Sequence, residues 1–177
     1  MNLRQISSLR EMPVVDLESG DLLGHIAGWV VSPRDQRVAA WRLNKTKLWQ
    51  TSPVIITADI AEYGPRMVVA RNRDTVIAPS EVVGLPELIA QKMTVVGFEA
   101  ATTAHRVLGR VTDLVFDVVT SQIQRYYIRP KALVSLLQTD LVLPASQVAQ
   151  IEANRVIFSD DATPIPSTVV QEQTQTA

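Results

Sequence analysis

The chain repeats one pattern of apolar residues and glycines at a fixed offset of 85 positions. Leu23 and Gly24 recur unchanged as Leu108 and Gly109, and the apolar positions around them recur as apolar residues. The recurring pairs are Leu22/Val107, Ile26/Val111, Trp29/Leu114, Val30/Val115, Val31/Phe116, Val38/Ile123, Trp41/Tyr126 and Leu43/Ile128. Polar positions do not recur with them. This pattern indicates that a scaffold has been duplicated and that a chemical site has not.

The repeat divides the chain of 177 residues into two units of about 80 residues each. We expect unit one over residues 10–83, a connecting helix over 84–92 and unit two over 93–161. Residues 162–177 are rich in Thr, Pro, Ser and Gln and show no apolar period, so we expect a disordered tail.

Short runs rich in β-branched residues, separated by turn residues, predict that both units consist mainly of β-strands. In unit one the expected strands cover residues 12–17, 23–31, 37–43, 54–56 and 75–78. Residues 58–64 end in glycine and resemble a single helical turn. The connecting helix is expected to begin near Leu85, with Pro86 in its first turn, where proline is tolerated.

The composition excludes several classes of function. The 17 Lys and Arg residues balance 18 Asp and Glu residues, so no global field attracts the chain to nucleic acid or to an anionic membrane. No cysteine is available for a disulfide, a thiolate nucleophile or a zinc-thiolate site. No apolar run approaches 20 residues and no signal peptide is recognisable. We therefore expect a cytoplasmic protein without a membrane span.

Unit two contains a longer motif with a recognisable form. Residues 107–117 read VLGRVTDLVFD, and after a polar turn residues 122–128 read QIQRYYI. This motif resembles the PRC-barrel family. Its common form is an apolar residue and a glycine, then a strand that contains an aspartate, a polar turn and a second strand. Unit one is similar, although Gly28 and Ser32 replace Asp113 and Asp117. The resemblance covers about residues 10–160.

This resemblance implies two tandem small antiparallel β-barrels, with short helical turns and a connecting helix. Members of the family include the barrel of a photosynthetic reaction-centre subunit and a domain of ribosome-maturation factors, which bind partners and do not catalyse reactions. We therefore expect a non-catalytic adaptor or assembly module with a protein partner, no cofactor and no small-molecule substrate. Association with a membrane through the partner stays open, as does the oligomeric state.

The strongest candidate binding residues form a basic stretch with interleaved tryptophans in unit one. They are Arg34, Arg37, Arg42, Lys45, Lys47 and Trp49. Trp49 stands outside the apolar period and is the favoured partner-facing residue, because exposed tryptophans often anchor interfaces. Basic residues beside aromatic rings also suit RNA, so an RNA-bound or ribosome-associated maturation factor is the alternative. A solvated hairpin face explains the same composition without a function.

Two further features have a structural and a functional interpretation. Asp113 and Asp117 lie four residues apart, so on a strand they share a face and suggest a metal-dependent enzyme as a weaker alternative. The structural interpretation is an outward polar position and an aspartate that begins a turn. Gly24 and Gly109 lack the further glycines of a phosphate-binding loop, and we expect each to mark a bend or bulge. Trp41 is expected in the core.

Overall fold

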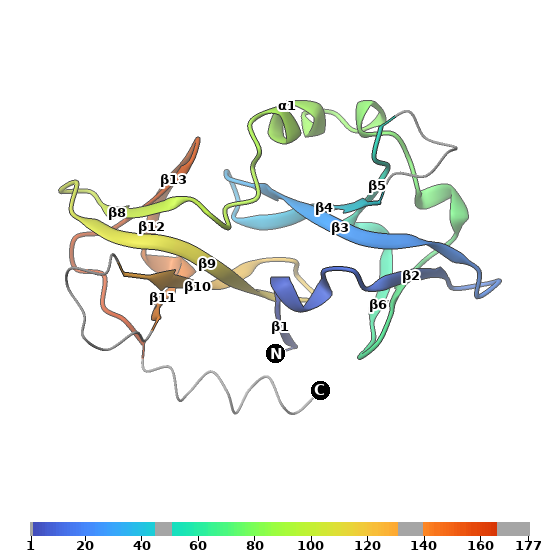
Figure 1. Ribbon diagram of the computed structural model, residues 1–177, viewed down its shortest axis with the longest axis horizontal. Helices are drawn as coiled ribbons and strands as arrows, with labels where there is room; N and C mark the ends of the chain where they lie inside the picture. Colours follow the sequence, from blue (N-terminus) through green and yellow to red (C-terminus); the bar gives the residue numbers. More distant parts are fainter. Residues whose placement is uncertain (1, 45–50, 131–139, 166–177) are drawn as a thin grey trace.

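The computed structural model of the protein describes residues 2–44, 51–130 and 140–165. These residues form a mainly β structure with one α-helix, α1 (Leu85–Ala90), and two sheets of mixed parallel and antiparallel strands. Figure 1 shows the sheet of unit one on the right, the sheet of unit two on the left and α1 above β3 and β4. The predicted mainly β fold class is confirmed, but the expectation of purely antiparallel units was wrong, because one pair of neighbouring strands in each sheet is parallel.

The sheet of unit one has six strands in the order β5-β4-β3-β2-β7-β6. Antiparallel pairing joins all neighbours except β2 and β7, which are parallel. The strands are β2 (Pro13–Asp16), β3 (Leu22–Ser32), β4 (Arg37–Leu43), β5 (Val54–Ile56), β6 (Ile60–Tyr63) and β7 (Val68–Ala70).

The sheet of unit two repeats this topology in the order β11-β10-β9-β8-β13-β12, again with one parallel pair, β8 and β13. Its strands are β8 (Glu99–Thr102), β9 (Val107–Asp117), β10 (Ile123–Arg129), β11 (Leu141–Pro144), β12 (Val148–Glu152) and β13 (Arg155–Phe158). A seventh strand, β1 (Leu3–Gln5), pairs with β9. Since β3 and β9 begin and end 85 positions apart, the repeat in the sequence is a repeat of the fold.

Two local predictions in unit one were wrong. The expected helical turn at residues 58–64 is a short 3-10 turn, Thr57–Asp59, followed by strand β6. Residues 75–78 do not form a strand, and Ile77 instead makes an isolated bridge to Val54 at the edge of β5. Pairing with β7 makes residues 60–63 a strand, whereas the pairing of residues 75–78 is limited to the one bridge at Ile77, and local propensity encodes neither outcome.

The two conserved glycines of the repeat lie at bulges. The pairing of β2 with β3 shifts by one residue next to Gly24, and the pairing of β8 with β9 shifts in the same way next to Gly109. Their φ angles are +156° and +153°, values that side chains rarely allow. The expectation of a bend or bulge at each glycine is confirmed.

The segments that precede the two sheets cross to the opposite unit. The N-terminal segment pairs with β9 of unit two through β1. The linker before β8 lies along β3 of unit one, where Val31 N donates to Met93 O at 2.7 Å and Trp29 Nε1 donates to Thr94 O at 2.8 Å. Each unit therefore supplies backbone hydrogen bonds to the long strand of the other.

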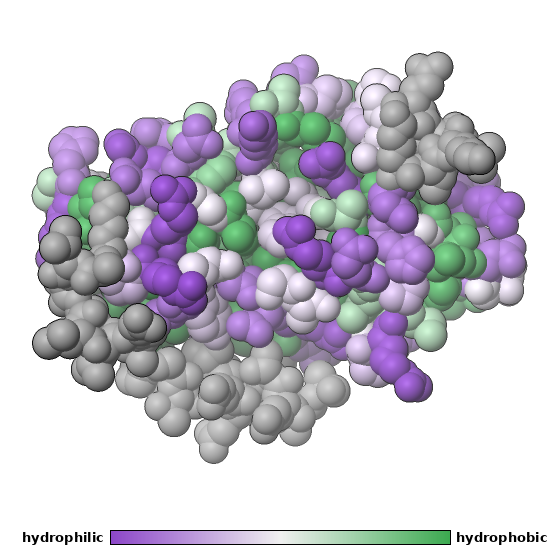
Figure 2. All heavy atoms as spheres, in the orientation of Figure 1, coloured by the Kyte–Doolittle hydropathy of each residue, from purple (hydrophilic) through white to green (hydrophobic). Residues whose placement is uncertain are grey.

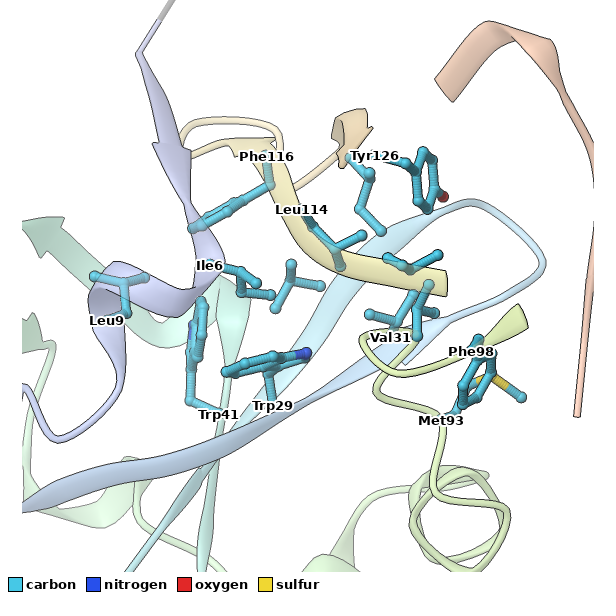
Figure 3. Close-up of a cluster of buried hydrophobic side chains, with 14 of the residues drawn as sticks. Ile6, Leu9, Trp29, Val31, Trp41, Met93, Phe98, Leu114, Phe116 and Tyr126 are labelled. Atoms are coloured by element: carbon cyan, nitrogen blue, oxygen red, sulfur yellow. The ribbon is translucent and has the colours of Figure 1, made fainter. Parts of the chain in front are cut away.

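One apolar core runs through both units (Figure 3). Trp41 is fully buried, as expected, and its ring centroid lies 5.6 Å from that of Phe116 in unit two. Tyr63 contacts both rings and accepts a hydrogen bond from Trp41 Nε1 at 2.8 Å. Further members of this core are Ile6, Leu9, Val31, Met93, Phe98, Leu114 and Tyr126. The two sheets are thus packed against each other through large side chains.

Replacing Gly109 by alanine should destabilise the fold more than the same change at Gly24. A Cβ at Gly109 would lie 2.1 Å from the backbone oxygen of Arg129, whereas at Gly24 the nearest atom is a side-chain oxygen of Asn44 at 3.2 Å. We expect Gly109→Ala to lower the free energy of unfolding by about 3 kcal/mol and Gly24→Ala by about 1 kcal/mol. Urea unfolding measures both values, and equal losses would contradict the prediction.

A cavity in unit two should destabilise unit one, because the core is shared. Phe116→Ala should lower the free energy of unfolding by about 3–5 kcal/mol. All three tryptophans belong to unit one, so tryptophan fluorescence follows the unfolding of that unit. The fluorescence transition should move together with the circular dichroism transition in this variant. A fluorescence midpoint that stays at the wild-type position would show that the units unfold independently.

Candidate partner-binding site

The predicted basic stretch does not form one compact cluster. Arg34 and Arg37 are exposed at the turn between β3 and β4, whereas Arg42 is partly buried near the other end of β4. Five residues of extended strand separate Arg37 from Arg42, which is roughly 17 Å. Lys45, Lys47 and Trp49 lie outside the described residues. The placed arginines therefore belong to two different regions of the surface.

The turn that carries Arg34 lies at the junction between the units. It meets the corresponding turn of unit two, between β9 and β10, and Arg37 forms an isolated bridge with Gln122. Two backbone bonds related by the 85-residue offset hold the turns together. They are Val38 N to Ser121 O at 2.9 Å and Ile123 N to Gln36 O at 2.8 Å. The junction consequently has approximate twofold symmetry around Arg37 and Gln122.

An apolar groove lies at the end of unit one, next to the turn between β2 and β3. It measures about 650 Å³, and Leu22, Leu23, Val76 and Ile77 form its apolar lining. Its charged lining residues are Arg73, Asp74 and Glu81. We call it the distal groove. Figure 2 shows apolar side chains gathered at this right-hand end of the molecule, among hydrophilic neighbours.

Two large apolar side chains at the turn between β2 and β3 are exposed to solvent, and one of them, Leu22, lines the distal groove. Leu17 is 60% exposed and Leu22 is 58% exposed, one on each side of the short turn between β2 and β3. In the sequence, a leucine stands on each side of the turn residues 18–21. The alternation of apolar and polar residues along the strands does not predict that these leucines are exposed. The groove was missed because its two walls are about 50 residues apart in the chain.

A buried carboxylate holds this turn in place. Asp16 is 7% exposed, and its Oδ1 accepts hydrogen bonds from Glu18 N at 2.7 Å and Ser19 N at 3.2 Å. These two backbone bonds are the main reason why the pKa of Asp16 is lowered. Arg73 also bonds Asp21 at 2.7 Å, which ties the turn to the opposite wall of the groove. Leu17 and Leu22 are thus presented by a fixed turn.

The aspartates suggested as metal ligands are engaged in local structure. Asp117 Oδ1 accepts bonds from Val119 N at 2.9 Å and Thr120 N at 3.0 Å, which confirms that it begins a turn. Asp113 accepts bonds from the backbone and the hydroxyl of Ser7, so it anchors the N-terminal segment to unit two. Within residues 2–44, 51–130 and 140–165 no three His, Asp or Glu side chains gather where they could hold a metal ion.

The lowered pKa of Asp16 predicts a loss of stability in acid. A carboxyl group whose pKa is lower in the folded state stabilises the protein above its ordinary pKa, near 3.8, and loses this contribution as the pH falls toward the folded value. Asp16→Asn should therefore make the urea midpoint less sensitive to pH between about pH 5 and pH 2. Parallel pH profiles of the two proteins would contradict this role.

The comparisons with known proteins leave the family open. No protein-family model matches the chain, and no curated protein matches it. In the part of the chain that the structure describes, no helix is both long and apolar enough to cross a membrane. The candidate site is accordingly defined by its own geometry: an apolar groove with charged lining residues, in which the exposed side chain of Leu22 takes part.

Proposed function

We propose that the protein is a non-catalytic protein-binding adaptor or assembly module built on two tandem PRC-barrel-like units. In this proposal the distal groove of unit one holds an apolar segment of a partner protein. The observation that carries it is the exposure of Leu22, a lining residue of the groove, on a turn whose other end carries the equally exposed Leu17. Apolar patches rimmed by polar residues are typical of interaction sites in soluble proteins.

The chemistry of the groove favours a protein over a small polar ligand. Leucine, valine and isoleucine side chains gain stability when an apolar partner removes them from water, by about 25 cal/mol for each Å² buried. Arg73, Asp74 and Glu81 provide charges of both signs around this lining. A rim of mixed charge contributes more to the choice of partner than to affinity.

The barrel-like part of the proposal is supported by the repeated strand order and by the bulges at Gly24 and Gly109. Bulges increase the local twist of a sheet and help it to curl. The motif that resembles the family coincides with β9, its turn and β10. In this proposal each sheet curls far enough to close into a small barrel.

The two alternatives receive less support. RNA binding relied on one basic and aromatic surface, and its three described arginines are divided between the junction and the far end of β4. A metal-dependent enzyme relied on Asp113 and Asp117, both of which already accept hydrogen bonds from neighbouring backbone. No described contact favours either function over protein binding.

A charge placed in the distal groove should abolish partner binding. Leu22→Glu leaves the fold intact because the side chain is already 58% exposed, and it should reduce retention of a co-purifying protein at least about tenfold. The measurement is affinity purification of the full-length protein, with mass spectrometry of the retained proteins.

Two matched variants serve as a control and as a comparison with unit two. Val119→Glu, at a residue that is 78% exposed and outside the distal groove, should retain the partner. Val107→Glu changes the position in unit two that corresponds to Leu22, and loss of the partner there would mean that both units bind. A partner that remains bound to Leu22→Glu would overturn the proposal.

A further inference from the structure

A second groove lies at the junction of the two units and is lined by both of them. It measures about 520 Å³. Unit one contributes the turn between β3 and β4, the region around Thr57 and the residue after β7, Arg71. Unit two contributes residues 118–121 of the turn between β9 and β10. We call this the junction groove, and it is separate from the distal groove and from the function proposed above.

The junction groove contains two arginines whose charge is not strongly neutralised. The Nε of Arg37 lies 3.8 Å from Asp35, and both side chains are about half exposed, so this ion pair is weak. Arg71 is exposed, and its guanidinium makes no ion pair with any described residue. The charged residues that line the groove are thus two arginines and one aspartate, which gives it a net positive charge.

Hydroxyl groups supply further donors in the same groove. Thr120 and Ser121 line it from unit two, and Thr57 lines it from unit one. Thr57 is 7% exposed, and its Oγ1 has no hydrogen-bond partner within the described residues. The Thr57 oxygen is closed off from solvent, so the hydroxyls that an acceptor in the groove can reach are those of Thr120, which is exposed, and Ser121, which is half-buried.

Arg37, Arg71 and Thr57 have no equivalent residues at the position that the internal repeat relates to the junction groove. The bond from Arg71 N to Asp59 O, at 3.0 Å, corresponds to the bond from Ser159 N to Gln147 O, at 2.9 Å, so Arg71 is the counterpart of Ser159. The remaining two counterparts are Gln122 for Arg37 and Ala145 for Thr57. Both cations and the buried hydroxyl are therefore absent from the symmetric position, although the scaffold there is the same.

We propose that the junction groove binds a phosphate-sized oxyanion, either inorganic phosphate or the phosphate of a small phosphomonoester. Arginine suits this ligand because its planar fork donates two parallel hydrogen bonds to a tetrahedral oxyanion. Arg37 and Arg71 supply the charge, and the hydroxyls of unit two complete the donor set. Because both units line the groove, a bound oxyanion stabilises the assembled junction.

The test is calorimetric titration of the full-length protein with inorganic phosphate and, in a second arm, with glycerol 3-phosphate, at constant ionic strength. We expect saturable binding of phosphate and an increase of the melting temperature that potassium chloride does not reproduce. Tighter binding of glycerol 3-phosphate would identify the ligand as a phosphomonoester, and equal or weaker binding would identify it as free phosphate. No saturable binding of either compound would overturn the proposal.

Three variants locate the site. Arg71→Gln should weaken phosphate binding roughly tenfold, whereas Arg66→Gln, an exposed arginine outside the groove, should leave it within about twofold. Asp35→Asn removes the competing carboxylate and should strengthen binding. Equal affinities for Arg71→Gln and Arg66→Gln would contradict the location.

Discussion

Hydrogen bonds exchanged between the two units hold the long central strand of each sheet in place. The N-terminal segment completes the edge of β9 in unit two, and the linker before β8 covers β3 in unit one. Where these crossings occur, Trp41 and Phe116 pack across the same junction. Each unit therefore depends on the other for some hydrogen bonds of its long strand and for some apolar contacts of its core. The two sheets form one folded body.

Because the two units share one core, core positions and surface positions are under different constraints after duplication. Positions inside the shared core must stay apolar in both units, because a change there affects both sheets. Surface positions carry no such restriction. Arg37 and Arg71 line one side of the junction, whereas Gln122 and Ser159 occupy the symmetric side. The sites of interest are therefore found where the two halves differ.

The sequence predicted those features whose cause is local or periodic. Alternating β-branched residues predicted the long strands and the burial of Trp41, and the isolated repeated glycines predicted bulges. The prediction failed at residues 58–64, where a glycine suggested a helical turn and pairing with β7 produced strand β6. It gave no sign that residues 3–5 form a strand, because so short a segment gains its hydrogen bonds only from a partner.

The 85-residue repeat reveals a duplicated scaffold without duplicated polar residues, because the apolar spacing lies along each strand and can be read from the chain. The positions of the two grooves, in contrast, follow from how the strands pair and pack. The distal groove joins Leu22 to Val76, and the junction groove joins Arg37 to Ser121, so both depend on contacts between segments far apart in the chain. Strand pairing and the exchange between units bring those segments together, and neither leaves a periodic signal in the sequence.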